Sequence, residues 1–189
     1  MLASLICLAI VFVSGSRSGL TAFLVTGLFL FMSARQIFSI PNRLGIGLII
    51  ILISFIVPFL QPRIWFEDRV EIWATALEAG FEAPIFGQGF GNSTQILHNT
   101  SEKLQNNVRF QFIDSGHNIF LEYWYSGGLL GLGSLIILIF LSLKKLIKKQ
   151  QIALIAAWLG LLTMFSYNPM SVVNLVELWW LIGLGLEKD

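Results

Sequence analysis

The stretch Asp114-Ser-Gly-His-Asn-Ile-Phe-Leu-Glu-Tyr-Trp-Tyr-Ser-Gly-Gly128 marks the point where a long polar loop ends and an apolar run begins that continues to Leu143. It contains His117, one of only two histidines in a chain that is 56% hydrophobic and 12% charged. A titratable imidazole at a membrane surface, beside Asn118 and close to Glu122, indicates chemistry rather than packing.

The apolar residues around this stretch are concentrated in blocks, and a mean hydropathy of +0.77 is too high for a soluble domain. Six apolar segments can be drawn, at 1–14, 19–34, 44–60, 126–143, 151–167 and 170–186. We therefore predict an all-α, polytopic integral membrane protein with about six transmembrane helices in a single membrane domain, 1–189. The single cysteine excludes an internal disulfide, no metal-type Cys/His spacing occurs, and no basic face suggests nucleic-acid binding.

Two short basic links predict the orientation. Arg35 and Arg43 flank the second link, and the fourth link carries Lys144, Lys145, Lys148 and Lys149. Neither link contains an acidic residue, so the positive-inside rule places both in the cytoplasm. Alternation then predicts that both termini are cytoplasmic and that the loop 61–125 and the turns at 14–19 and 167–169 face outward.

The outer loop, 61–125, is acidic and too long for a plain connector. Asp68-x-x-Glu71 resembles a capping box and Gly80 is a candidate helix stop, with one apolar face formed by Val70, Trp73 and Leu77. This pattern predicts a short amphipathic helix lying on the membrane or on the bundle.

Glycines recur after this predicted helix. Gly87, Gly89 and Gly91 lie in a short run that permits a tight turn or close approach to a ligand, with no clear strand or helix beside it. Residues 92–113, rich in Asn, Gln, Ser and Thr, are expected to form a mobile flap. Gly127-x-x-x-Gly131 predicts close helix packing beneath His117.

Three motifs fall on the predicted outer face in a fixed order. They are Ser16-Arg17-Ser18-Gly19, then Arg69-x-x-x-Trp73 with Pro84-Ile-Phe-Gly87-Gln-Gly89-Phe-Gly91, and finally His117-Asn118-x-Phe-Leu-Glu122 with Gly127-Gly-Leu-Leu-Gly131. Together they resemble the C-terminal half of the O-antigen ligase and O-antigen polymerase family of bacterial envelope proteins. Members of that family have around a dozen spans, so we expect the chain to be the C-terminal part of a longer protein.

The resemblance implies a fold and an activity. Such proteins are membrane glycosyltransferases of the broad C class in the bacterial inner membrane, thought to work without a metal or other cofactor. They transfer a glycan from an undecaprenyl-pyrophosphate carrier to an acceptor saccharide, such as lipid A core or another repeat unit, on the periplasmic side. Ligase and polymerase activities both remain open.

The resemblance also implies residue roles. Arg17 and Arg69 would bind the pyrophosphate, because fixed guanidinium groups stabilise the charge of a phosphate leaving group. His117 would be the general base for the acceptor hydroxyl. Asn118 or Glu122 would orient its ring, and the loop glycines Gly87, Gly89 and Gly91 would support the site.

Glu177 lies in the sixth apolar segment, in register with Ser171 and Asn174. An intramembrane carboxylate is expected to be paired or to face a wet cavity, so Glu177 is a candidate to line the carrier groove, to support Arg17 or to join two helices.

Alternative interpretations remain open. Arg17 is also explained as an interfacial anchor, Arg69 as the partner of a nearby carboxylate, and His117 as a structural hydrogen-bonding residue. For the whole chain, the alternatives are a transporter or channel subunit and a non-catalytic membrane scaffold.

Overall fold

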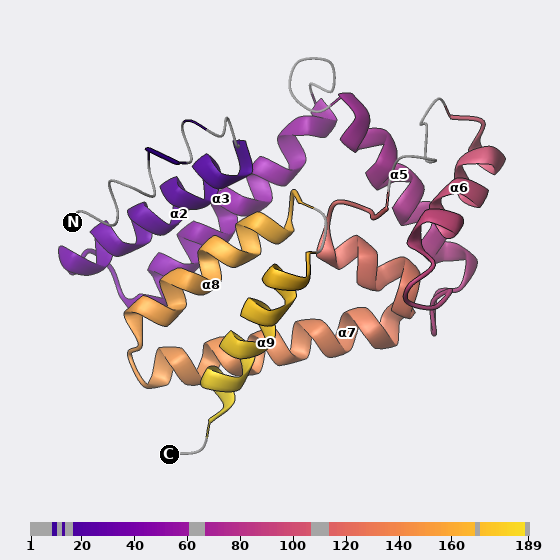
Figure 1. Cartoon of the computed structure of the whole chain (residues 1–189). Helices are drawn as coiled ribbons and strands as arrows, with labels where there is room; N and C mark the ends of the chain where they lie inside the picture. The colour runs from indigo at the N-terminus through magenta and orange to yellow at the C-terminus, as the bar shows by residue number, and fades with distance from the viewer. Residues whose placement is uncertain are drawn as a thin grey trace.

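A computed structural model describes residues 9–10, 13, 17–60, 67–106, 114–168 and 171–187. These residues form helices and connecting turns and contain no strand, which confirms the all-α prediction (Figure 1). The helices are α2 (Arg17–Ala34), α3 (Ile40–Leu60), α5 (Glu67–Glu82), α6 (Ser93–Leu104), α7 (Ile119–Lys148), α8 (Ile152–Phe165) and α9 (Val172–Leu186).

The predicted apolar segments correspond to helices wherever the structure describes them. The segments at 19–34, 44–60, 126–143, 151–167 and 170–186 coincide with α2, α3, most of α7, α8 and α9, whereas most of 1–14 lies outside the described residues. Among the described residues, α7 is the one helix long and apolar enough to cross a membrane. The apolar helices Ser18–Ala34, Ile40–Leu52, Ile152–Phe165 and Val172–Leu186 are shorter, so six spans remain a prediction.

Helix α8 forms the centre of the bundle and contacts α2, α3, α7 and α9. Trp158, Leu159 and Phe165 of α8 are fully buried, together with Phe29 of α2 and Leu135 of α7. A helix that is apolar all round is expected in such a central position, because each of its faces meets a neighbour.

The closest approach between α7 and α9 depends on small residues. A Cβ atom added to Gly185 would lie 1.9 Å from Oγ of Ser142. That hydroxyl donates to the carbonyl of Leu181 (3.2 Å) and accepts from Nε1 of Trp158 (3.2 Å), so one serine joins three helices. Such close contacts through small and hydroxyl-bearing residues are typical of membrane bundles.

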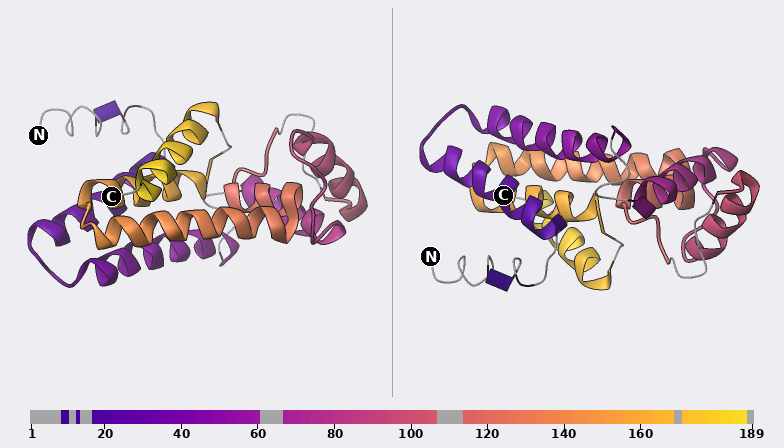
Figure 2. Two further views of the ribbon diagram at one scale, coloured as in Figure 1. Left: turned by 90° about the horizontal axis from the view of Figure 1, so that it is seen from below. Right: turned by 90° about the horizontal axis from the view of Figure 1, so that it is seen from above.

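Both basic links lie at one end of the bundle, and α5 and α6 lie at the other (Figures 1 and 2). Nζ of Lys145 donates to the carbonyl of Leu186 (3.0 Å), and Nζ of Lys149 donates to that of Glu187 (3.3 Å). These lysines satisfy carbonyls at the C-terminal end of α9, where positive charge also complements the helix dipole.

Helix α5 differs from its predicted form. Asp68 lies inside the helix rather than at a cap, and the helix continues past Gly80 to Glu82, so both predicted ends were wrong. Gly80 lies within the helix, and glycine is needed there because the Trp124 ring lies against it: an added Cβ atom would be 1.9 Å from Nε1 of that indole.

The predicted apolar face of α5 was also partly wrong. Leu77 is 48% exposed, and the buried face consists of Ile72, Trp73, Thr75, Ala76 and Ala79. The prediction of a mobile flap at 92–113 was wrong for residues 93–104, which form α6. Ile96 and Leu97 of α6 are buried against Ile72, Ala76 and Ala79 of α5, which explains both differences.

Candidate functional site

His117 lies in the turn that leads into α7. Its backbone is left-handed, with φ of 50°, a conformation that histidine adopts more readily than most residues but still at some cost. Its amide donates to Oγ of Ser115 (3.3 Å). The imidazole is partly buried, and its Nδ1 has no hydrogen-bond partner among the described residues.

The surroundings of His117 favour the neutral imidazole. Burial lowers the pKa of His117 below its ordinary value of 6.5, and the positive charge of Arg69 lowers it further, while Asp114 and Glu122 act in the opposite direction. Arg69, in the first turn of α5, is therefore within electrostatic reach of the ring. A neutral imidazole at pH 7 has a free lone pair and is able to accept a proton.

Glu122 holds the backbone of this turn. Its carboxylate is 4% exposed and accepts hydrogen bonds from the amide of Gly116 (3.0 Å) and from the hydroxyls of Ser93 and Tyr125. It thus connects α6 to the residue that precedes His117. Its hydrogen bonds hold the turn, and its charge acts on the imidazole only through space.

Asn118 is the N-cap of α7 and connects two helix ends. Its Oδ1 accepts from the amides of Phe120 (2.9 Å) and Leu121 (3.2 Å), and its Nδ2 donates to the carbonyl of Ser166 at the end of α8 (3.1 Å). A cap of this kind fixes where a helix begins. It also fixes the position of His117, the preceding residue.

The segment that follows α8 also contacts the first turn of α2. Nδ2 of Asn168 donates to Oγ of Ser18 (2.9 Å), so the backbone of Arg17 begins α2 at the same end of the bundle as His117. The side chain of Arg17 lies outside the described residues. Trp73, one turn after Arg69, packs on Tyr167 with ring centroids 6.1 Å apart. The three predicted site residues thus come from helix ends joined around the segment 166–168.

The glycine run forms the loop that connects α5 to α6. The sequence had indicated no clear helix beside this run, and that expectation was wrong. Gly87, Gly89 and Gly91 all have positive φ, at 71°, 98° and 89°. The loop packs against a break in α7 at Gly128, where φ is 61° and ψ is −159°.

Backbone hydrogen bonds join the loop to this break. The amides of Gln88 and Gly89 donate to the carbonyls of Tyr125 (2.8 Å) and Ser126 (2.9 Å). In return, the amides of Leu129 and Leu130 donate to the carbonyls of Pro84 (2.8 Å) and Ile85 (3.2 Å). The loop therefore replaces helical hydrogen bonds that the break removes.

Glycine is required where the two backbones meet. A Cβ atom on Gly87 would lie 2.3 Å from the backbone of Ser126, and one on Gly128 would lie 2.5 Å from that of Ile85. Among the described residues, the Phe90 ring rather than another helix packs against Gly127 and Gly131, about 3.0 Å from a Cβ atom placed on Gly127, which differs from the predicted helix packing.

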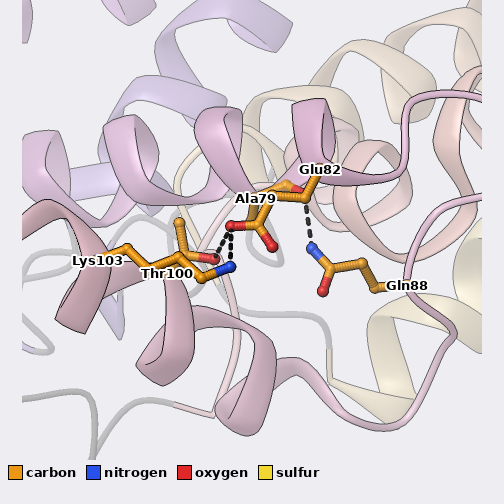
Figure 3. A network of polar contacts seen from close by, with 5 residues as sticks. All are labelled: Ala79, Glu82, Gln88, Thr100 and Lys103. Carbon is orange, nitrogen blue, oxygen red and sulfur yellow. Dashed lines mark hydrogen bonds and ion pairs between the residues drawn. The ribbon is translucent and has the colours of Figure 1, made fainter.

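Side-chain contacts join the loop to α5 and join α5 to α6 (Figure 3). Nε2 of Gln88 donates to the carbonyl of Ala79 (2.6 Å). Oε1 of Glu82 accepts from Nζ of Lys103 (2.9 Å) and from the hydroxyl of Thr100 (3.5 Å). The loop and the two helices thus form one cap over the N-terminal part of α7.

Glu177 is separate from this arrangement. Its exposed side chain lines a cavity of about 840 Å³ between α2, α8 and α9, and neither His117 nor Arg69 lines that cavity. The cavity wall includes small residues of α2 and α8, among them Gly19, Ala22 and Gly160, and Trp180 of α9. Within the described ranges, no group of three or more His, Cys, Asp or Glu side chains is placed to hold a metal.

The sequence did not identify every residue that builds the site. Ser93, Tyr125, Ser166 and Asn168 all hold site residues or their neighbours in place. The N-cap role of Asn118 could have been recognised from an Asn that precedes an apolar helix, but nothing local to Ser93 indicates a partner 29 residues away.

Comparison with known proteins identifies the family of the chain. No curated protein matches the sequence. The sequence model of the O-antigen ligase family matches residues 2–136, a range that includes Arg17, Arg69, the glycine loop and His117. The chain therefore belongs to the O-antigen ligase family, a family of membrane proteins.

Proposed function

We propose that the protein transfers a glycan from an undecaprenyl-pyrophosphate carrier to an acceptor saccharide on the periplasmic face of the bacterial inner membrane. Membership of the O-antigen ligase family implies a glycosyltransferase-like enzyme. The observation that carries the residue assignment is a partly buried His117 whose pKa is lowered by burial and by Arg69, inside the range matched by the family.

The reaction requires one proton transfer and one bond exchange. The acceptor hydroxyl oxygen attacks the anomeric carbon of the carrier-linked glycan while His117 takes the hydroxyl proton. The bond between that carbon and the pyrophosphate oxygen breaks, and the electron pair leaves with the lipid pyrophosphate. Arg69 and Arg17 stabilise the negative charge that grows on this leaving group.

The charges around His117 suit this role. Arg69 helps to keep the imidazole neutral before the reaction, so that it can accept a proton. Asp114 and Glu122 favour the imidazolium that forms when the proton arrives. Glu122 and Asn118 contribute by holding the turn through Gly116 and the first turn of α7.

The test is a transfer assay in lipid nanodiscs with a lipid-pyrophosphate-linked glycan and an acceptor saccharide. His117→Ala should lower the transfer rate by about 100-fold or more, the usual contribution of a general base, while carrier binding is retained. Arg69→Gln should weaken carrier binding as well.

The other histidine provides a matched control. His98 lies on the exposed side of α6, 3.2 Å from Glu102, and His98→Ala should keep the wild-type rate. A fully active His117→Ala variant would refute the base assignment. Absence of transfer by the wild-type chain, with or without a supplied N-terminal half, would instead support a transporter subunit or scaffold.

A further inference from the structure

The depth of the α7 break in the bilayer determines whether the glycine loop lies in water or in lipid. Gly128 precedes Lys144 by 16 residues, which is about 24 Å of helix at 1.5 Å per residue. The hydrocarbon core of a bilayer is about 30 Å thick. With Lys144 at one boundary of this core, Gly128 lies inside the hydrocarbon, near the opposite boundary.

Backbone polar groups at that depth need partners inside the protein, because unsatisfied groups cost several kcal/mol each in lipid. The loop provides these partners. Its amides bind the carbonyls of Tyr125 and Ser126, and its carbonyls bind the amides of Leu129 and Leu130. Four bonds of 2.8–3.2 Å require the loop backbone to lie at the same depth as the break.

Further polar groups of the loop have hydrogen-bond partners within the protein. The amide of Gly87 donates to the carbonyl of Ala83 (2.8 Å), in addition to the bonds made by Gln88 and Gly89. The polar side chain of Gln88 is directed inward to the carbonyl of Ala79 (Figure 3). These contacts satisfy the amides of Gly87, Gln88 and Gly89 and the side-chain Nε2 of Gln88 without solvent.

Apolar side chains occupy the outer surface of the loop. Phe86 is 76% exposed, and Ile85 and Phe90 are 55% and 56% exposed. Leu129 and Leu130, whose amides bind the loop, are also more than half exposed. The exposed surface of the loop is therefore continuous with the surface of α7, the helix that is long enough to span the membrane.

We propose that residues 84–90 form a re-entrant loop inserted into the leaflet opposite the lysine link, with Ile85, Phe86 and Phe90 in contact with acyl chains. Its glycines permit the backbone to approach the break in α7. This surface is distinct from the His117 centre, and the proposal does not depend on transferase activity.

Site-directed spin labelling tests the insertion. In a Cys7→Ser background, which removes the only cysteine, Phe86→Cys and Ile85→Cys are labelled separately in nanodiscs without added polyprenyl carrier. Gln95→Cys, on the exposed side of α6, is the matched control. Two labelled positions guard against failure of one variant to fold.

Labels at positions 86 and 85 should collide at least several-fold more often with oxygen, which dissolves in lipid, than the label at 95 does. The same labels should collide less often with a water-soluble nickel chelate. Nickel access equal to that at position 95 would place the loop in water and overturn the proposal. Exclusion of both probes would also overturn it, because the surface would then be covered by protein.

Discussion

At the scale of single residues, the charges near His117 should set the pH dependence of transfer. The base must be neutral, so the rate falls as pH drops through the pKa of the imidazole. Burial and Arg69 lower this pKa, so the acid limb of the pH–rate profile should have an apparent pKa below 6.5.

Two variants should move that limb in opposite directions. Arg69→Gln removes a positive charge, raises the pKa of His117 and should shift the acid limb of the residual activity to higher pH. Asp114→Asn removes a negative charge and should shift it to lower pH. If neither substitution changes the position of the limb, another group controls the titration.

Candidate site residues were easier to predict from the sequence than the contacts that those residues make. His117 and the arginines stand out because titratable groups are rare in an apolar chain, and the structure brings Arg69 within electrostatic reach of His117. The contact of Glu122 with Gly116 and Ser93 was not predictable, because it depends on how α6 returns to α7.

At the scale of elements, Gly128→Ala tests the joint between the loop and α7. Alanine would have to adopt φ of 61° and ψ of −159°, a region occupied almost only by glycine, and would place Cβ 2.5 Å from the backbone of Ile85. The conformation alone costs about 1–3 kcal/mol, and the clash adds to it. We expect a lower midpoint of thermal unfolding in detergent and faster proteolysis within 84–92.

Gly133→Ala is the control for that substitution, since it lies five residues along the same helix with nothing within 4 Å of an added Cβ atom. It should be neutral or slightly stabilising, because alanine favours helix by up to about 1 kcal/mol. Equal midpoints for the two variants would show that the close approach at Gly128 contributes nothing to stability.

The contact between α7 and α9 permits a similar comparison on one helix. Gly185→Ala should destabilise the bundle by about 1–3 kcal/mol, because the new methyl group meets Ser142 and forces the helices apart. Gly183→Ala has nothing within 4 Å and should not destabilise it. The measurement is the midpoint of thermal unfolding of both variants in the same detergent. An equal decrease in the midpoint for both would contradict the close packing of Gly185 against Ser142.

The apolar helices were predictable because a long apolar block has few alternatives to a helix in lipid. Helix α6 was not, since its composition is polar and only a short stripe that includes Ile96 and Leu97 is buried. The same contact explains the misassigned face of α5: Leu77 fits an isolated amphipathic helix, but the position of α6 and α7 decides which residues become buried.

At the scale of the whole molecule, the basic links and the candidate site lie at opposite ends of the bundle. The lysine and arginine links lie at one end of the bundle, whereas α5, α6 and the start of α7 lie at the other (Figures 1 and 2). Arg69 belongs to the first turn of α5, and His117 lies in the turn that leads into α7. If the positive-inside rule holds for both links, every candidate catalytic residue faces outward, the side on which the proposed carrier and acceptor meet.

Cysteine accessibility in right-side-out membrane vesicles tests this orientation. In the Cys7→Ser background, Gln95→Cys marks α6 and Gln151→Cys marks the lysine link, and both positions are exposed. A membrane-impermeant maleimide should label position 95 in sealed vesicles and position 151 only after permeabilisation. The reverse pattern would place His117 on the cytoplasmic side, where it cannot transfer a glycan to a periplasmic acceptor. That result would refute both the orientation and the proposed reaction. Labelling of both positions in sealed vesicles would show that the two ends do not lie on opposite sides of a membrane.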